Sequence, residues 1–310
     1  STKLTVIMPI YNGEKEWIDI SIKSILTQTY RKFHFLIIND GSNDEISNYL
    51  EHYTQDARIK IRHHHKNQGL THTLNEGLNL SNTTWVARMD SDDWAHPDRF
   101  KIQMEYLESH PETTVLGTQA TYLEDNKLLH PNLPLFYDQV AATLPFYCCI
   151  CHPSTILNRK QIIAGNSYPD IKNAEDYGLW LNLLYDKKVI INLPNILIKY
   201  RKGIKRPNYH DQQKINTINI QKAFDQKIGM QNIRPEFIQD STWDYIDLWY
   251  AEYYQLLIKH IPYIDRHSLT RLITYQKRVA AKKLYRKNQL PLFRYLRQKM
   301  IYLYYKNKPF

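Results

Sequence analysis

Short apolar runs alternate with helical patterns along the first two hundred residues. The runs, which predict buried strands, occupy residues 3–8, 33–38, 59–62 and 85–89. Between them apolar residues recur every three or four positions, which predicts amphipathic helices with the stripes Ile18, Ile22, Ile25 and Leu26, and then Leu70, Leu74 and Leu78. Strands that alternate with helices at this spacing indicate βαβ units and a mainly parallel sheet.

The alternation continues to about residue 206 and then stops. Residues 97–108 read as a helix with a proline near its first turn, residues 114–122 as a strand, and the segment from Glu175 as another helix. Beyond Pro207 only helical spacing remains, at 243–258 and in two stripes: Leu269, Leu272, Ile273, Val279 and Ala280, then Leu292, Leu296, Met300 and Leu303. We expect an α/β domain at 1–206, with halves 1–95 and 96–206, and a helical region at 207–310.

Polar residues follow three of the predicted strands. They are Tyr11 and Asn12, the run from Asn39 to Ser42, and the acidic run from Asp90 to Asp93. In parallel sheets ligands bind beyond the carboxyl ends of the strands, so these clusters predict one polar crevice. Asp90 and Asp92 are one residue apart, and two such carboxylates can share a hard divalent cation that also holds phosphate oxygens. An Asp-rich turn at a strand end is the plainer alternative.

The composition indicates a cellular compartment and shows that charge is unevenly distributed along the chain. No run reaches the roughly 18 apolar residues of a membrane span, and the first residues form a strand pattern instead of a secretory signal. Three clustered cysteines, Cys148, Cys149 and Cys151, suit a reducing compartment, so we expect a cytoplasmic protein. The net charge is +10, and residues 266–310 carry 13 Lys and Arg but no Asp or Glu. That asymmetry predicts a polyanionic partner, and a basic amphipathic segment favours an anionic membrane surface over packing of its stripes on the body.

Taken together, these stretches resemble an inverting glycosyltransferase of family 2 with the GT-A fold, an α/β fold with a mainly parallel, Rossmann-like sheet flanked by helices. Each motif alone is weak, but seven occur in the family's order over about residues 3–201. The matching stretches are TVIMPIYN at 5–12, NDGSND at 39–44, NQGL at 67–70 with NEG at 75–77, RMDSDD at 88–93 with PDR at 97–99, HPS at 152–154, EDYGLW at 175–180 and YR at 200–201.

The resemblance implies roles for particular residues. Asp176 matches the catalytic base, and Asp92 with Asp90 would hold Mg²⁺ or Mn²⁺. Contacts with the nucleotide-sugar donor, usually a UDP-sugar, are implied for Pro9, Tyr11, Asp40, Arg88, Asp90 and Ser91. The acceptor side is implied for His152, Glu175, Trp180 and Arg201. The acceptor itself would be a glycan or lipid-linked oligosaccharide at the inner membrane face, and a single displacement would give a β-linked product.

The chain departs from the family pattern at two places. Asn39 stands where an aspartate is common, and no histidine directly follows Arg201, which leaves His210, Lys202, Lys205 or Arg206 as candidates for the phosphates.

Other motifs favour plainer interpretations. Cys148–His152 has the ligand types for zinc or haem but lacks a second paired cluster. The run from His63 to His65 reads as a solvated strand end, because adjacent strand residues point to opposite faces. A sugar-nucleotide pyrophosphorylase remains an alternative, although the Gly-rich basic loop that it needs is absent. A protein that binds single-stranded nucleic acid through the Tyr- and Arg-rich tail is a second alternative. We expect no nucleic-acid partner.

Overall fold

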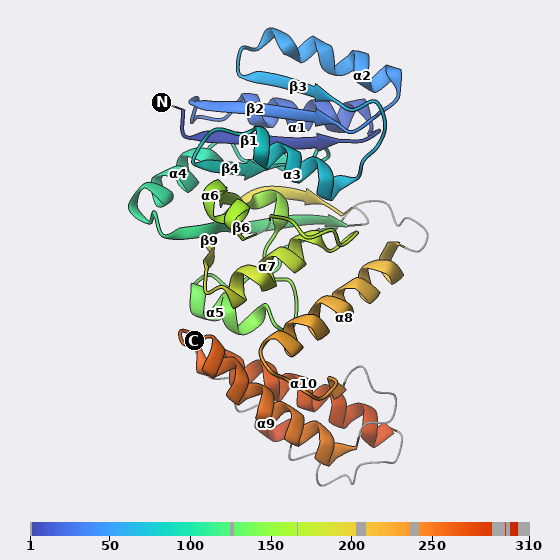
Figure 1. The fold of residues 1–310 in the computed structure, drawn as a ribbon, viewed down its shortest axis with the longest axis vertical. Helices are drawn as coiled ribbons and strands as arrows, with labels where there is room; N and C mark the ends of the chain where they lie inside the picture. Colours follow the sequence, from blue (N-terminus) through green and yellow to red (C-terminus); the bar gives the residue numbers. More distant parts are fainter. Residues whose placement is uncertain are drawn as a thin grey trace.

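The computed structural model describes residues 2–124, 127–165, 167–202, 209–235, 242–286, 295 and 298–302. One mixed sheet runs through it, built from β1 (Leu4–Ile10), β2 (Phe33–Asn39), β3 (Ile59–His63), β4 (Trp85–Arg88), β5 (Trp94–Ala95), β6 (Thr113–Glu124), β7 (Lys127–Leu129), β8 (Ile156–Asn158) and β9 (Val189–Arg201). Their order is β3-β2-β1-β4-β8-β6-β9-β5, with β7 beside β6 (Figure 1).

The first four strands are parallel to one another, as their buried apolar runs predict. β8 is antiparallel to both β4 and β6, whereas β6 and β9 run parallel over most of their length. The expected mainly parallel α/β sheet is therefore confirmed, with antiparallel strands inserted in its middle and at its β5 edge.

β1 extends one residue beyond Pro9, where the sequence pattern ends the strand. β4 pairs with β1 only as far as Ile7, so β1 has no neighbour on that side at Pro9. On the other side β1 stays paired with β2 as far as Ile10. A proline, which has no N–H, is tolerated where no ladder hydrogen bond is needed.

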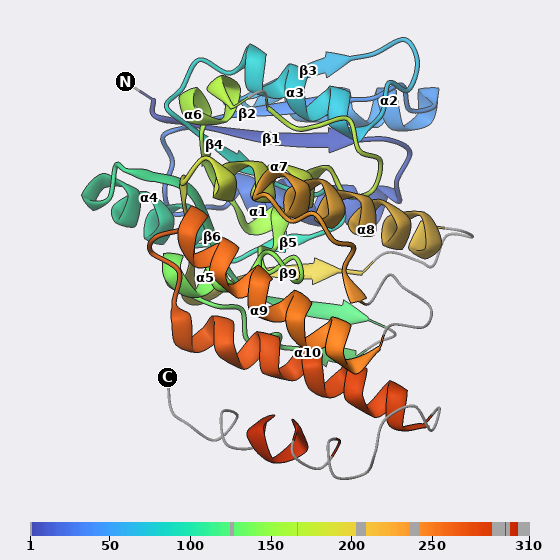
Figure 2. The same cartoon turned by 60° about the horizontal axis from the view of Figure 1, so that its bottom comes forward.

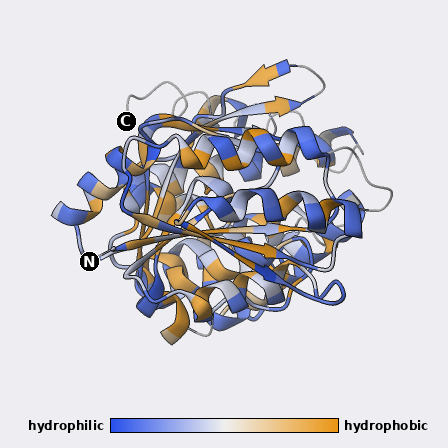
Figure 3. Cartoon of the chain, turned by 90° about the horizontal axis from the view of Figure 1, so that it is seen from above, coloured by the Kyte–Doolittle hydropathy of each residue, from blue (hydrophilic) through white to orange (hydrophobic). Residues whose placement is uncertain are grey.

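Helices cover both faces of the sheet (Figures 1 and 2). They are α1 (Lys15–Leu26), α2 (Asp44–Glu51), α3 (Leu70–Leu80), α4 (Arg99–Ser109), α5 (Tyr137–Thr143), α6 (Arg159–Ala164), α7 (Glu175–Tyr185), α8 (Tyr209–Lys227), α9 (Trp243–His260) and α10 (Arg266–Arg286), with short 3-10 turns η1 (His52–Gln55) and η2 (His152–Ser154). The apolar residues form two clusters, one containing the α1 and α4 side chains and the other those of α3 and α7. Figure 3 shows the apolar strands between these helices.

The C-terminal helices continue one of these two cores. α10 packs on α9 and α5, and its residues Leu269 and Ile273 belong to the same buried cluster as Trp180 of α7. The first apolar stripe of the basic tail therefore packs on the body, and our expectation that it faces a membrane is wrong for these residues. Only Val279 of that stripe is exposed. Of the second stripe, Met300 is exposed, whereas Leu292, Leu296 and Leu303 lie outside the described residues.

Within the described part of the chain, no helix is both long and apolar enough to cross a membrane.

Candidate active site

The ends of β1, β2 and β4 meet at one edge of the sheet, as the parallel register requires. The backbone N–H of Asp40 donates to the carbonyl oxygen of Ile10 over 2.7 Å, which prolongs the β1–β2 ladder by one bond beyond the end of β2. Tyr11 comes directly after β1, and its ring is 52% exposed. An exposed aromatic residue and the buried Asp40 thus follow two neighbouring strands at this edge.

Asp40 organises the loop between β3 and α3. Its Oδ1 accepts the backbone N–H of Gln68 over 2.8 Å and bonds His64 Nδ1 over 2.7 Å. Its Oδ2 accepts Asn67 Nδ2 over 3.0 Å and the N–H of Gly69 over 2.9 Å. A carboxylate offers about four acceptor positions, so all of them are taken. A direct contact between Asp40 and a donor base, as the resemblance implies, therefore needs one of these bonds to give way.

Gly41 allows the loop between β3 and α3 to pack directly against the backbone that follows β2. Its φ is +72°, and a Cβ at this position would lie 2.4 Å from the backbone nitrogen of Asn67. Both facts require glycine, because L side chains rarely adopt this conformation and no space is left for one.

The acidic segment after β4 begins with an internal ion pair. The buried guanidinium of Arg88 contacts Asp90 Oδ1 through Nη2, and its Nη1 donates to the carbonyl oxygen of Met89. Ser21 of α1 donates to the carbonyl oxygen of Asp90 over 2.6 Å. Arg88 is thus a buried counter-charge for Asp90. The contact with the nucleotide-sugar donor that the resemblance implies for Arg88 would require its side chain to leave the interior.

Asp92 and Asp93 lie in an excess of negative charge. Burial, together with the charge of Asp90, raises the pKa of Asp92 to about 6. The pKa of Asp93 is raised well above its usual value by burial and by the charges of Asp90 and Asp92. Among the described residues, Asp93 Oδ2 has no hydrogen-bond partner. Crowded carboxylates with an unpaired buried oxygen favour a bound cation, so the donor set fits the oxygen-seeking Mg²⁺ or Mn²⁺ that the resemblance implies.

Arg201 joins the end of β9 to this acidic segment. Its backbone N–H donates to Asp93 Oδ1 over 2.7 Å, and its Nε donates to the carbonyl oxygen of Asp92 over 3.3 Å. The guanidinium lies 3.3 Å from the centroid of the Trp17 ring of α1, a close cation–π contact. Arg201 is therefore held at the site by three elements, and its partial exposure leaves it within reach of a ligand.

The first turn of α7 carries two more carboxylates toward Arg88. Burial, and then the charge of Asp176, raises the pKa of Glu175 to about 7. Burial also raises the pKa of Asp176 to about 6, and Asp90 adds to this shift while Arg88 opposes it. Asp176 Oδ1 accepts the N–H of Tyr177 over 2.7 Å, which orients the carboxyl group. A partly exposed carboxylate with a raised pKa has the properties of a general base.

Two residues expected on the substrate side lie deeper than predicted. His152 is buried, and its Nε2 lies 2.8 Å from the hydroxyl of Tyr168. Burial, followed by the charge of Arg88, lowers the pKa of His152 well below its usual value. Trp180 has no exposed surface and packs edge-on against His152. A side chain without exposed surface does not touch a substrate in this conformation, so the expected contact of Trp180 is corrected to a packing role.

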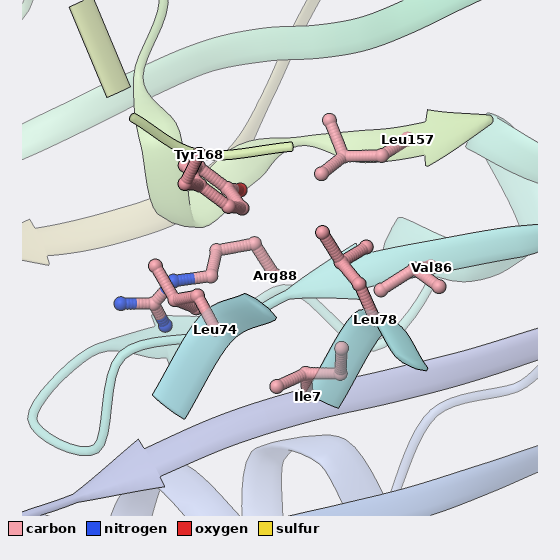
Figure 4. A pocket seen from close by; sticks show the side chains of 7 residues that line it. All are labelled: Ile7, Leu74, Leu78, Val86, Arg88, Leu157 and Tyr168. Atoms are coloured by element: carbon pink, nitrogen blue, oxygen red, sulfur yellow. The ribbon is translucent and has the colours of Figure 1, made fainter. Parts of the chain in front are cut away.

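A small cavity lies behind Arg88 (Figure 4). Its volume is about 10 Å³, and its lining consists of Ile7, Leu74, Leu78, Val86, Arg88, Leu157 and Tyr168. This space holds one water molecule at most. It belongs to the packing beneath the site and does not accommodate a nucleotide.

The sequence interpretation missed several residues of this edge. The sequence predicts no role for Asp93 beyond its place in the acidic run, although its burial and its bond to Arg201 anchor the acidic segment. Trp17 and Tyr168 carried no signal, because their partners are far away in the sequence. His64 was interpreted as part of a solvated strand end, which is wrong, since its side chain is 2% exposed. His63 and His64 nevertheless point to opposite sides, as expected for adjacent strand residues, because His63 bonds Asn39 and Glu51 whereas His64 bonds other partners.

The phosphate candidates after β9 have different surroundings. Lys202 Nζ donates to Glu124 over 2.9 Å, and His210 lies in the first turn of α8. Lys205 and Arg206 lie outside the described residues.

Comparison with known proteins agrees with this arrangement. The family model described as glycosyl transferase family 2 matches residues 5–165. The O-antigen biosynthesis glycosyltransferase WbnJ of Escherichia coli is 35% identical over 207 residues, which cover 64% of this chain and 79% of WbnJ.

Two solved structures share the fold at low identity. S. aureus TarS 1–349 in complex with UDP-GlcNAc has a TM-score of 0.58 at 16% identity, covering 93% of this chain and 92% of that one. The mannosyltransferase PcManGT of Pyrobaculum calidifontis, in complex with GDP-Man and Mn²⁺, has a TM-score of 0.56 at 15% identity and covers 98% and 82%.

Proposed function

This chain belongs to glycosyl transferase family 2, and we propose that it is an inverting enzyme that moves a sugar from a UDP-sugar to a hydroxyl of a cell-surface glycan or lipid-linked oligosaccharide. The UDP-GlcNAc bound to TarS supports the donor class, and the similarity to WbnJ, a glycosyltransferase of O-antigen biosynthesis, supports the acceptor class. One observation carries the proposal. Asp90 and Asp92 follow β4 and Asp176 lies in the first turn of α7, yet all three carboxylates interact electrostatically with Arg88.

On the donor side we assign the cation to Asp92, with Asp90 beside it. When bound, Mg²⁺ or Mn²⁺ neutralises the negative charge that develops on the diphosphate leaving group. The exposed ring of Tyr11 is available to stack beside the donor base. Pro9 and Ser91 border the same crevice and are partly exposed. Asp40 would act on the donor through the loop that it holds, because its own oxygens are already engaged.

On the acceptor side we assign proton removal to Asp176. The acceptor hydroxyl gives its proton to this carboxylate while its oxygen forms a bond to the anomeric carbon. The bond from that carbon to the diphosphate oxygen breaks at the same time, and the nucleoside diphosphate leaves with the electron pair. One displacement inverts the anomeric centre, so an α-linked donor gives a β-linked product. A base of this kind contributes roughly 10²- to 10⁴-fold to the rate.

The remaining residues have supporting roles in this proposal. Glu175 lies beside Asp176, and its charge is governed by the same burial. Arg201, partly exposed next to Asp92, is available to a diphosphate or an acceptor. We divide the chain into a catalytic domain at 1–206, with a donor half at 1–95 and an acceptor half at 96–206, and a helical region at 207–310.

We further propose that the enzyme works in the cytoplasm at the inner face of the membrane. The support is the surface charge of α10, where Arg266, Lys282, Lys283 and Arg286 are all exposed. Basic side chains near an anionic bilayer contribute about 1 kcal/mol each. Because the apolar stripe of α10 is packed, such docking would rest on charge and not on insertion.

The experiment is a donor screen on the full chain with a panel of nucleotide sugars and Mn²⁺. Release of the nucleoside diphosphate from one or a few sugars is expected, and its loss in the Asp176→Asn variant ties it to the site. Asp186, at the C-terminal cap of the same helix, supplies the matched control Asp186→Asn. Release of pyrophosphate from UTP and a sugar phosphate would instead indicate a pyrophosphorylase. Salt-resistant RNA binding without any turnover would indicate a nucleic-acid-binding protein.

A further inference from the structure

Three potential metal ligands lie together next to Asp40. They are His64, which follows β3, and His72 and Glu76 of α3. One ligand atom of each lies within 4.8 Å of the others. His72 and Glu76 are four residues apart, so they share one face of the helix, the spacing at which two side chains chelate one ion.

Two of the three potential ligands, His64 and Glu76, are already oriented by a hydrogen bond to a residue outside the cluster. His64 Nδ1 bonds the Asp40 carboxylate over 2.7 Å, which leaves Nε2 turned toward Glu76. Glu76 Oε1 accepts Arg62 Nε over 3.0 Å, which leaves Oε2 turned toward His64. A histidine whose other nitrogen bonds a carboxylate is the usual arrangement around zinc, since the outer partner fixes the ring and raises its basicity.

The burial of the three side chains suits an ion that enters from solvent. His64 is buried, Glu76 is partly exposed and His72 is exposed, so the cluster opens outward through His72. The two rings meet edge to face with centroids 5.9 Å apart. Tetrahedral zinc, with bonds of about 2.0–2.2 Å, holds its nitrogen and oxygen ligands about 3.3 Å apart. The side chains would need only small adjustments, chiefly the opening of the direct His64–Glu76 hydrogen bond.

We propose that His64, His72 and Glu76 form a second metal site, for a borderline transition metal such as Zn²⁺, separate from the carboxylate site at Asp92. Two imidazoles and one carboxylate match the nitrogen-rich preference of such ions, whereas the oxygen ligands of Asp90 and Asp92 suit Mg²⁺ or Mn²⁺. Three protein ligands leave one position open to water or a further ligand.

The site would act on the donor crevice through Asp40. The same carboxylate that orients His64 accepts the N–H groups of Gln68 and Gly69. Gly69 caps the N-terminus of α3, the helix that carries the other two ligands. An ion that joins His64 to α3 would therefore link both ends of the loop between β3 and α3, which Asp40 already holds. It would keep this loop in place beside the expected position of the donor base.

The test is a titration of the untagged full chain with Co²⁺, without nucleotide and with excess Mg²⁺ to occupy carboxylate sites. Tetrahedral Co²⁺ absorbs visible light, so the readout is independent of turnover and of the proposed function. We expect one Co²⁺ per chain, displaced by Zn²⁺, in the wild type and in Asp92→Ala. His72→Ala and Glu76→Gln should weaken binding at least tenfold, because each removes one ligand.

The matched control is His65→Ala, which removes an exposed histidine next to the cluster but outside it. Because His72 and Glu76 are not buried, their variants should fold, and circular dichroism checks this. The proposal is overturned if the wild type shows no visible Co²⁺ band. It is equally overturned if His72→Ala binds Co²⁺ as tightly as His65→Ala.

Discussion

The backbone N–H of Arg201 donates to Asp93 Oδ1 over 2.7 Å across 108 residues of sequence. Asp93 directly precedes β5, and Arg201 is the last residue of β9. Together with the pairing of β5 on β9 and the bond from Arg201 Nε to the carbonyl oxygen of Asp92, this bond holds the acidic segment against the strand that leads into the C-terminal helices. The site is thereby assembled from both halves of the sheet.

We expect Asp93→Ala to destabilise the protein by about 1–3 kcal/mol, because the buried N–H of Arg201 loses its acceptor. Asp93→Asn should cost less at pH 8, since the amide oxygen still accepts and the repulsion from Asp90 and Asp92 is relieved. Urea unfolding of both variants at pH 8 measures this difference. Equal destabilisation by Ala and Asn would show that the hydrogen bond contributes little.

Asp92→Ala should abolish metal-dependent UDP binding, because the carboxylate assigned to the cation is lost. Isothermal titration calorimetry with UDP, with and without Mn²⁺, measures the effect. The control is Asp98→Ala, which removes a carboxylate that bonds only the hydroxyl of Thr29 on the surface. Unchanged UDP affinity in the presence of Mn²⁺ would mean that the cation is held elsewhere.

Asp176→Asn should keep donor binding but lose roughly 10²- to 10⁴-fold in kcat, because an amide has the same shape but cannot take the proton. Steady-state transfer to an acceptor, together with UDP-sugar binding, separates the two effects. A variant with near wild-type kcat would move the base to another residue, and Glu175 would be examined first.

The pKa of Glu175, raised to about 7, predicts a pH-dependent stability. Between its unfolded pKa, near 4.5, and about 7 the folded protein binds more protons than the unfolded chain, so this group makes wild-type stability fall as pH rises. Glu175→Gln removes the buried charge and should stabilise the protein at pH 8 by about 1–3 kcal/mol.

At pH 5 wild-type Glu175 is itself neutral in the folded protein, so the advantage of the glutamine should largely vanish. Urea unfolding of both proteins at pH 5 and pH 8 tests this sign. A variant that is less stable than the wild type at pH 8 contradicts it.

The exposed lysines of α10 predict charge-dependent binding to anionic vesicles. Lys282→Glu/Lys283→Glu should weaken flotation with such vesicles, and salt should do the same, because surface charges are screened over about 8 Å at physiological ionic strength. Lys60→Glu/Lys101→Glu makes the same change in net charge at exposed positions of β3 and α4. Substitution is preferable to truncation, since α10 packs into the core. Equal flotation of both variants would remove a role for α10.

The sequence by itself determined the first four strands, the helices α1 and α3 between them and the chemistry of the strand ends. Apolar runs such as 33–38 report burial on both faces of a strand, and a stripe such as Leu70, Leu74 and Leu78 reports one buried helix face, because both patterns depend on local periodicity. Polar residues at the ends of β1, β2 and β4 then had to share an edge, since those strands are parallel. The family motifs in the same places explain why the acidic segment could be located in advance.

Only the tertiary structure decided which partners those residues have. Periodicity states that a residue is buried but not against what, so the stripe of α10 favoured a membrane face in the sequence, whereas the structure packs it on the body. β5 pairs with β9 through Trp94 and Lys199, and this pairing of two distant segments places Arg201 next to Asp93. His64, taken for a solvated residue, lies between the carboxylates of Asp40 and Glu76 because α3 folds back over the end of β3. Hydrogen bonds and charges act over distances in space, and the chain brings such groups together only when its sheet and helices have packed.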